Sequence, residues 1–84
     1  MSLSAHKING PKGVGALYVR RGTSLASWLH GGGHEQGLRA GTENVAGIVG
    51  FGAAAQLRSR EMTTEAQRLE GLRDRLASGL MAAI

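Results

Sequence analysis

The segment from residue 23 to residue 41 limits what this chain can fold into, because it shows no sustained helical or strand periodicity and carries glycine at positions 31, 32, 33, 37 and 41. Three consecutive glycines stabilise neither a helix nor a strand, but they permit unusual backbone angles and let main-chain N–H groups face a ligand or a neighbouring subunit. Structureless segments of about twenty residues inside compact domains are usually functional or disordered. We therefore expect a long glycine-rich loop between two structured parts.

The part before this loop predicts a short strand and an exposed turn. Residues 14–19, Val-Gly-Ala-Leu-Tyr-Val, form an apolar run between turn signals, which is typical of a strand. Residues 20–23 should form the turn that ends it. Residues 1–8 are expected to be a strand end that leads into a loop presenting Lys7, and the Asn-Gly-Pro signal at residues 9–11 should fix the backbone of that loop.

The part after the loop predicts two helices. Thr42 is a good N-cap for the first helix, which should run to about residue 60 with apolar residues at helical spacing at Val45, Ile48, Val49, Ala53 and Leu57. The second should run from Thr63 or Thr64 to about Met81, since Thr64 and Gln67 fit a capping box and an apolar stripe follows at Leu69, Leu72, Leu76 and Leu80. Glycines at 47, 50 and 52 each cost the first helix about 1 kcal/mol relative to alanine, which suggests tight packing against another element.

Two positions suggest binding chemistry. Lys7 is one of only two lysines, follows a histidine and precedes a turn, and a partly desolvated lysine amine is easier to deprotonate and can attack an aldehyde. Thr42, with Arg39 nearby and the free N–H groups of a helix N-terminus, would suit a phosphate or carboxylate. Taken alone, each has a simpler alternative: a surface lysine beside a turn, and a plain capping threonine.

Longer motifs favour the binding interpretation. These are SAHK at residues 4–7, GPKGVGALYVR at 10–20, GGGHE at 31–35, GLRAGTENV at 37–45 and GIVGFGAA at 47–54. Together they closely resemble the segment that carries the pyridoxal-phosphate lysine in cysteine desulfurases, the NifS/IscS-like group of the class V aminotransferase family. The resemblance is strong over residues 4–57 and loose beyond. It implies an α/β fragment, part of the large domain of a fold-type I PLP-dependent transferase, with a lysine loop and strand at 1–22, a glycine-rich loop at 23–41 and two helices at 42–84.

The resemblance also implies roles for individual residues. Lys7 matches the catalytic lysine that forms a Schiff base with pyridoxal 5'-phosphate and then carries a proton. Ser4 and His6 match residues that hydrogen-bond the cofactor phosphate in the same subunit. Thr42 matches the threonine that reaches the phosphate of the other subunit's cofactor, which would put residues 31–42 at a homodimer interface. Full-length relatives convert L-cysteine to L-alanine and pass the sulfur, through an enzyme persulfide, to acceptors such as iron–sulfur cluster scaffolds.

Several parts of such an enzyme are missing from these 84 residues. There is no cysteine to carry the persulfide, the carboxylate that pairs with the pyridine nitrogen is expected upstream, and the substrate-binding arginine is expected beyond Ile84. We therefore expect a fragment that is inactive alone. The alternatives are another class V enzyme, such as a selenocysteine lyase or an aminotransferase, although RAGTEN at residues 39–44 favours a desulfurase, and a small helical interaction module that uses the leucine stripe without catalysis.

Composition argues against other classes. The net charge is +4 and the isoelectric point is near 10.8, but the arginines of residues 58–75 alternate with carboxylates, as on a solvated helix face, and the few aromatic residues offer no platform for bases. Nucleic acid is therefore not an expected partner. Without cysteine there is no disulfide or thiolate metal site, and without a long apolar run or signal-peptide core the predicted location is cytoplasmic, with no membrane partner.

Three further motifs fail on their context. The His-Gly-Gly-Gly of residues 30–33 resembles an esterase oxyanion segment, but no Gly-x-Ser-x-Gly elbow accompanies it. His30, His34 and Glu35 would suit zinc only on a helix, which the intervening glycines disfavour. Residues 10–13, Gly-Pro-Lys-Gly, lack the spacing of a nucleotide-binding P-loop. No metal site is therefore predicted.

Overall fold

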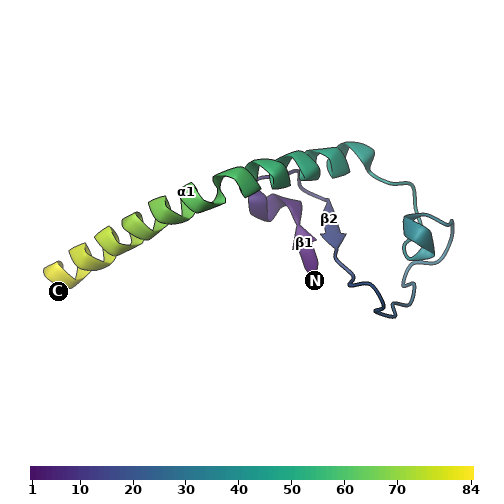
Figure 1. The fold of residues 1–84 in the computed structure, drawn as a ribbon, viewed down its shortest axis with the longest axis horizontal. Coiled ribbons are helices and arrows are strands. Elements are labelled where there is room, and N and C mark those ends of the chain that lie inside the picture. Colours follow the sequence, from purple (N-terminus) through teal and green to yellow (C-terminus); the bar gives the residue numbers. More distant parts are fainter.

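The computed structural model describes all residues from 1 to 84, and its elements follow one another in the order strand, short helix, strand, short helix, long helix. They are strand β1 (Ser2–Ser4), the 3-10 helix η1 (Ala5–Ile8), strand β2 (Gly15–Leu17), the 3-10 helix η2 (Glu35–Gly37) and the α-helix α1 (Val45–Ala83). The strands and η1 lie beside the N-terminal half of α1, whereas its C-terminal half extends away from them (Figure 1). The predicted α/β class is confirmed.

β1 and β2 form an antiparallel pair in which Ser2 lies opposite Leu17 and Ser4 lies opposite Gly15. β2 falls inside the predicted strand at residues 14–19. Glycine is needed at position 15 because a Cβ there would lie 2.8 Å from the carbonyl oxygen of Leu3 on the facing strand. The expected turn follows at residues 20–23, where the N–H of Thr23 donates to the carbonyl of Arg20 at 3.0 Å.

The glycine-rich loop folds back on itself between β2 and α1. Leu29 and Arg39 form an isolated parallel bridge, and the N–H of Ala40 donates to the carbonyl of Leu29 at 3.2 Å. The Ser27 hydroxyl donates to the carbonyls of Leu29 and Leu38 at 3.1 and 3.3 Å. These bonds close the loop into a compact hairpin-like excursion at the N-terminal end of α1 (Figure 1).

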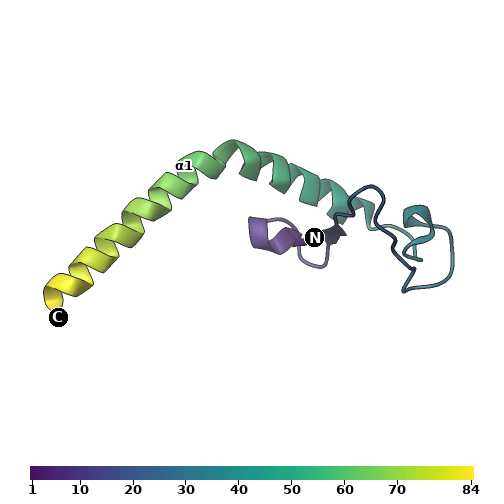
Figure 2. The ribbon, with the colours of Figure 1, turned by 60° about the horizontal axis from the view of Figure 1, so that its bottom comes forward.

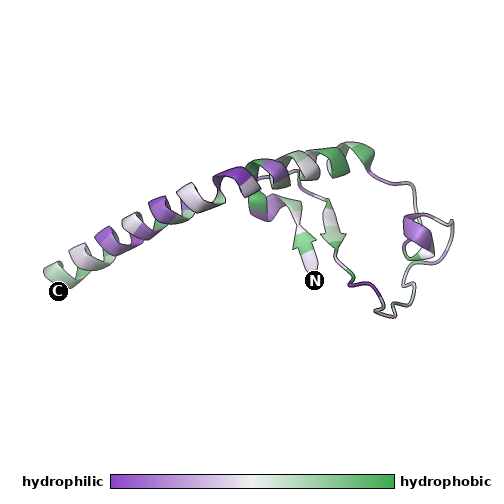
Figure 3. Ribbon diagram, in the orientation of Figure 1, coloured by the Kyte–Doolittle hydropathy of each residue, from purple (hydrophilic) through white to green (hydrophobic).

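A single helix of 39 residues replaces the two helices expected at residues 42–84. Neither glycine nor proline occurs between residues 53 and 70, so nothing ends the first helix before Thr63 and Thr64, and both threonines lie inside α1. Instead of a boundary between two helices, α1 has a bend in its green middle part, which Figure 2 shows most clearly. The helix is mostly apolar in its first half and mixes apolar with charged residues in its second half (Figure 3).

The N-cap of α1 is Asn44, not Thr42 as expected. The Asn44 side-chain oxygen Oδ1 accepts a hydrogen bond from the N–H of Gly47 at 3.1 Å. Asparagine ranks with aspartate and serine at this position and above threonine, so the helix begins at Val45. Glu43 consequently lies before the first turn, which contains no acidic residue.

The small core of the chain is formed by small side chains. Only two of the 84 residues are buried, Ala5 of η1 and Gly47 of α1. The least exposed positions of α1 are Gly47, Gly50, Phe51, Ala54, Arg58 and Glu65. The first five recur at spacings of three and four residues, which defines one face of the helix. The larger apolar residues that recur at helical spacing are not part of this core: Val45, Ile48, Val49 and Leu57 are 46–66% exposed.

This difference has a steric reason. Glycine and alanine let the backbone of the Lys7 loop approach α1 closely, whereas valine, isoleucine or leucine on the same face would hold it away. The tight packing against another element that the helix glycines indicated is present at Gly50, which meets Pro11. Gly47 meets only the side chain of Asn44, the N-cap of the same helix, and Gly52 has no neighbour within 4 Å of its Cβ position. No helix in the structure combines the length and the apolar character that crossing a membrane requires.

Candidate functional site

Lys7 lies on a turn that is closed by hydrogen bonds at both ends. The N–H of Ala5 donates to the carbonyl of Val14 at 3.1 Å, and the N–H of Gly10 donates to the carbonyl of Ala5 at 2.8 Å. Asn9, which ends η1, also donates its N–H to the Ala5 carbonyl. Because both backbone groups of Ala5 are bonded and its side chain is fully buried, the turn from residue 5 to residue 14 is a fixed unit, which we call the lysine turn.

The backbone at Asn9 explains the Asn-Gly-Pro sequence. Asn9 has a φ of 63° and a ψ of 22°, in the left-handed region, which asparagine tolerates better than most residues. The next residue has no room for a side chain: a Cβ on Gly10 would lie 3.0 Å from the Cβ of Ala5 and 3.2 Å from the Cβ of Ala54. The expectation that this signal fixes the loop backbone is confirmed.

The lysine turn packs on the face of α1 that carries Gly50 and Ala54, which we call the small face. A Cβ on Gly50 would lie 2.6 Å from Cγ of Pro11 and 3.2 Å from its Cδ, so the proline ring occupies the space above that glycine. Gly10 meets Ala54 one turn further along the helix. This contact between residues about 40 apart in sequence is the main tertiary contact of the site. Its one sequence signal was the glycine at position 50 inside a helical segment.

The structure brings Ser4, His6 and Lys7 together at one end of the strand pair. Ser4 ends β1 and precedes η1 without capping it through its hydroxyl. His6 and Lys7 lie in the last turn of η1. All three side chains are exposed, and none takes part in the hydrogen bonds and ion pairs of the chain. A hydroxyl, an imidazole and a lysine amine therefore occur within four consecutive residues, exposed and without a partner inside the chain.

Thr42 does not join this cluster within the chain. It is exposed and lies on the segment that leads into α1, three positions before Val45. The lysine turn contacts α1 at Gly50 and Ala54, so five further residues of helix, about 7.5 Å along the axis, separate Val45 from the nearest contact. Figures 1 and 2 both show η1 well away from the N-terminal end of α1.

Arg39, expected to assist Thr42, bonds the backbone instead. Its Nη1 donates to the carbonyl of Ala40 at 2.7 Å. The guanidinium folds over Gly41, whose φ is 104°, and a Cβ on Gly41 would lie 2.7 Å from Nη1. Arg39 thus orders the approach to α1, and the anion site expected from Arg39, Thr42 and the helix N-terminus is not assembled by these residues.

The histidines of the glycine-rich loop do not form a metal centre. No three side chains of the metal-binding types lie close enough together to hold an ion. His34 precedes η2, and its ring lies over Gly32, where a Cβ would be 2.9 Å from Nδ1. That nitrogen is buried and has no hydrogen-bond partner.

The shifted pKa values belong to a pair on α1, away from the lysine turn. The Arg68 guanidinium donates to both carboxylate oxygens of Glu65, at 2.7 and 2.8 Å. This hydrogen bonding lowers the pKa of Glu65 and raises that of Arg68. The pair is an exposed i, i+3 contact, so it supports the helix surface and takes no part in the candidate site.

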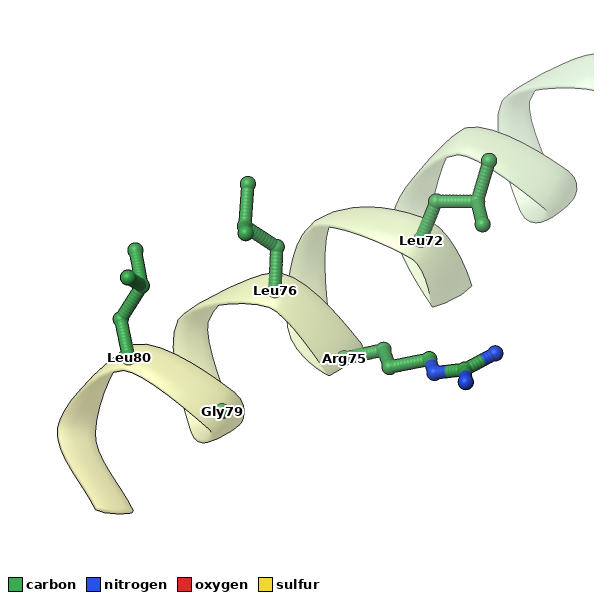
Figure 4. A pocket seen from close by; sticks show the side chains of 5 residues that line it. All are labelled: Leu72, Arg75, Leu76, Gly79 and Leu80. Carbon is green, nitrogen blue, oxygen red and sulfur yellow. The ribbon is translucent and has the colours of Figure 1, made fainter. Parts of the chain in front are cut away.

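A second surface of note lies on the C-terminal half of α1. Leu69, Leu72, Leu76 and Leu80 are 48–64% exposed. In Figure 4, Leu72, Leu76 and Leu80 project in one direction from successive turns, while Arg75 points away from them. This leucine row has the expected helical spacing and meets no other part of the chain.

Comparison with known proteins gives one consistent result. The sequence pattern of the aminotransferase class-V family matches residues 1–83. A cysteine desulfurase of Bradyrhizobium diazoefficiens is 54% identical over 81 residues, which are 96% of this chain and 21% of that protein. A cysteine desulfurase IscS of an Anaeromyxobacter species (strain Fw109-5) is 59% identical over 85 aligned positions, covering 99% of this chain and 21% of that protein.

The three-dimensional comparison agrees. The solved structure of a NifS-like protein superposes with a TM-score of 0.90 at 51% identity, covering 95% of this chain and 22% of that one. The predicted fold and the predicted resemblance are thereby confirmed. The chain spans about a fifth of the length of the relatives it matches.

Proposed function

This chain belongs to the aminotransferase class-V family, and we propose that it forms part of a pyridoxal-phosphate-dependent cysteine desulfurase in which Lys7 is the cofactor-binding lysine. The observation that carries this proposal is the lysine turn: a closed, docked backbone that presents Ser4, His6 and Lys7 with no competing partner inside the chain. The names of the relatives supply the reaction class.

The residues present fit pyridoxal 5'-phosphate by their chemistry. A phosphate requires several fixed donors, and the Ser4 hydroxyl and the His6 imidazole can each donate one hydrogen bond to it. Of these three groups, only the Lys7 amine can combine with an aldehyde. Since the three residues lie within four consecutive positions that include the fully buried Ala5, the backbone fixes the points from which their side chains extend.

When bound, the cofactor supplies an electron sink that stabilises negative charge on the substrate. The chain's own residues orient it and handle protons. In this proposal Lys7 would hold the cofactor through Nζ, and the same atom would accept and return a proton during the reaction. Ser4 and His6 keep the phosphate end fixed meanwhile.

Thr42 acts on a different copy of the cofactor in this proposal. Its position beyond the N-terminal end of α1, away from the lysine turn, supports a role toward a second subunit, so that the phosphate site is complete only in a homodimer. The irregular backbone of residues 31–42 would form the contact between the subunits.

The proposed substrate is L-cysteine, with L-alanine and transferable sulfur as products. The sequence contains no cysteine, so the thiol that receives the sulfur must come from outside these 84 residues. A sulfur-acceptor protein, such as an iron–sulfur cluster scaffold in the cytoplasm, is the proposed partner. A selenocysteine lyase or an aminotransferase remains the alternative within the family.

Reductive trapping tests the assignment of Lys7. The full-length protein is incubated with pyridoxal 5'-phosphate and reduced with borohydride, and the modified peptide is identified by mass spectrometry. We expect modification at Lys7, its loss in Lys7→Arg, and its retention in the matched control Lys12→Arg. Ser4→Ala combined with His6→Ala should weaken it. Equal modification of Lys7 and Lys12 would show only nonspecific amine chemistry and would contradict the proposal.

A further inference from the structure

We propose that Gly50 is a positioning residue for Lys7: the missing side chain at position 50 creates the space in which Pro11 rests, and this contact fixes the turn that carries the lysine. The inference rests on the proposed function, because it assigns the docking of the lysine turn on α1 a part in holding the cofactor. The short helix η1 of this turn lies beside the N-terminal half of α1 (Figure 1).

The contact leaves no room for a larger residue. A Cβ on Gly50 would lie 2.6 Å from Cγ of Pro11 and 3.2 Å from Cδ. The proline ring cannot rotate out of the way, because it is part of the backbone and its φ is fixed. Any side chain at position 50 must therefore displace the turn itself.

Displacement of Pro11 would reach Lys7 by a short route. The neighbouring Gly10 is bonded through its N–H to the carbonyl of Ala5, at 2.8 Å. Ala5 opens η1, and Lys7 lies two residues later in the same helix. Since Gly10 meets both Ala5 and Ala54, it is held between η1 and α1, and a shift at the adjacent Pro11 would move the short helix that carries the lysine. Functional groups need placement within about 0.5 Å, so even a small shift matters.

A neighbouring glycine provides the matched control. Gly52 lies in the same helix two residues later, is exposed, and has no heavy atom within 4 Å of its Cβ position. Replacing either glycine with alanine raises helix propensity equally. The two variants therefore differ in one respect, the contact with Pro11.

The experiment compares Gly50→Ala, Gly52→Ala, Pro11→Ala and the double variant Gly50→Ala/Pro11→Ala in the full-length protein. Pro11→Ala removes the ring atoms that a Cβ at position 50 would meet. Two properties are measured: the hydrogen-exchange rate of the Gly10 amide in cofactor-free protein, and the rate at which pyridoxal 5'-phosphate, followed by its absorbance band, is lost on dilution.

We expect Gly50→Ala to accelerate both exchange and cofactor loss by about tenfold. Both rates in Gly52→Ala should stay within about twofold of those of the protein without substitutions. Both rates in the double variant should lie within about threefold of those of Pro11→Ala. The inference is overturned if Gly50→Ala matches Gly52→Ala, or if Pro11→Ala fails to relieve its effect.

Failure of the proposed function gives a different pattern. In that case the protein without substitutions shows no selective reaction of Lys7 with the cofactor, while the Gly10 amide still exchanges faster in Gly50→Ala than in Gly52→Ala. The reverse pattern is selective modification of Lys7 with identical Gly10 exchange in both glycine variants. That result would contradict the positioning role of Gly50 and would leave the desulfurase proposal unaffected.

Discussion

At the N-terminus of α1, one side-chain hydrogen bond replaces a missing backbone partner. The Gly47 N–H, which has no carbonyl four residues back within the helix, donates to Asn44 Oδ1 at 3.1 Å. We expect Asn44→Ala to lower the free energy of unfolding by about 1 kcal/mol and to speed exchange of the Gly47 amide.

The matched control is Thr42→Ala, which should change the free energy of unfolding by less than about 0.5 kcal/mol, since Thr42 caps nothing. Denaturant unfolding of both variants measures the difference. A larger loss in Thr42→Ala than in Asn44→Ala would return the cap to Thr42.

The Glu65–Arg68 pair makes the stability of α1 depend on pH. Hydrogen bonding by Arg68 lowers the pKa of Glu65 in the folded helix, so the pair stabilises the helix above the ordinary pKa of a glutamate. That contribution is lost as the pH falls through the lowered pKa. NMR titration of the Glu65 carboxyl should show a pKa below the usual value and its return toward that value in Arg68→Gln. The control Arg73→Gln should leave it unchanged; an unchanged pKa in Arg68→Gln would contradict the assignment.

At the scale of elements, the continuity of α1 through residues 63–65 can be tested with a single proline. If a second helix began after Thr64, Glu65 would be its first residue, where proline is tolerated. In the continuous helix, Glu65→Pro removes a backbone hydrogen bond and should cost about 3 kcal/mol, with a loss of helical circular dichroism. Glu65→Ala is the control, since it removes the ion pair and keeps the backbone bond. Equal stability of the two variants would restore the two-helix interpretation.

How far the sequence predicts these elements depends on whether the signal is local. The lysine turn and β2 could be predicted because Asn9-Gly10-Pro11 and the apolar run at residues 14–19 act through their own backbone. The continuity of α1 could not be predicted, because the Thr64/Gln67 capping box indicated a second helix. Such a pair begins a helix only where another signal has ended the preceding one. The candidate residues Ser4, His6 and Lys7 came from a motif, and their roles stay predictions.

The packing face of α1 was not predictable from hydrophobicity. The apolar stripe suggests that Ile48 and Val49 are buried, whereas the structure packs the smaller Gly50 and Ala54 against the lysine turn. Which face is chosen depends on the shape of Pro11 and Gly10, some 40 residues away, and shape complementarity at that distance leaves no periodic signal in one sequence.

The whole molecule is extended. Its radius of gyration is 19.0 Å and its extents are 60 × 26 × 22 Å, whereas a compact domain of this length has a radius of gyration of about 12 Å. Large apolar side chains remain uncovered, with Trp28 of the glycine-rich loop 88% exposed. A surface of this kind normally packs against further protein.

We therefore expect the isolated 84-residue chain to unfold gradually on heating, because so few of its residues are buried. Scanning calorimetry measures this: a fully packed domain of this length would absorb about 60 kcal/mol in one transition, and such a transition would contradict the expectation. The isolated chain should also release no alanine from L-cysteine, since it contains no cysteine to take the sulfur. Detectable alanine would overturn that prediction.

The unbroken course of α1 has a mechanical consequence. Thirty residues of continuous helix separate Gly50, where the lysine turn rests, from Leu80 in the leucine row, a distance of about 45 Å along the helix. A rigid rotation of about five degrees at Gly50 would move Leu80 by about 4 Å over that length. A small change of helix angle at Gly50 is therefore amplified at the leucine row. Conversely, a contact that immobilises the leucine row restricts the angle at which α1 packs against the lysine turn.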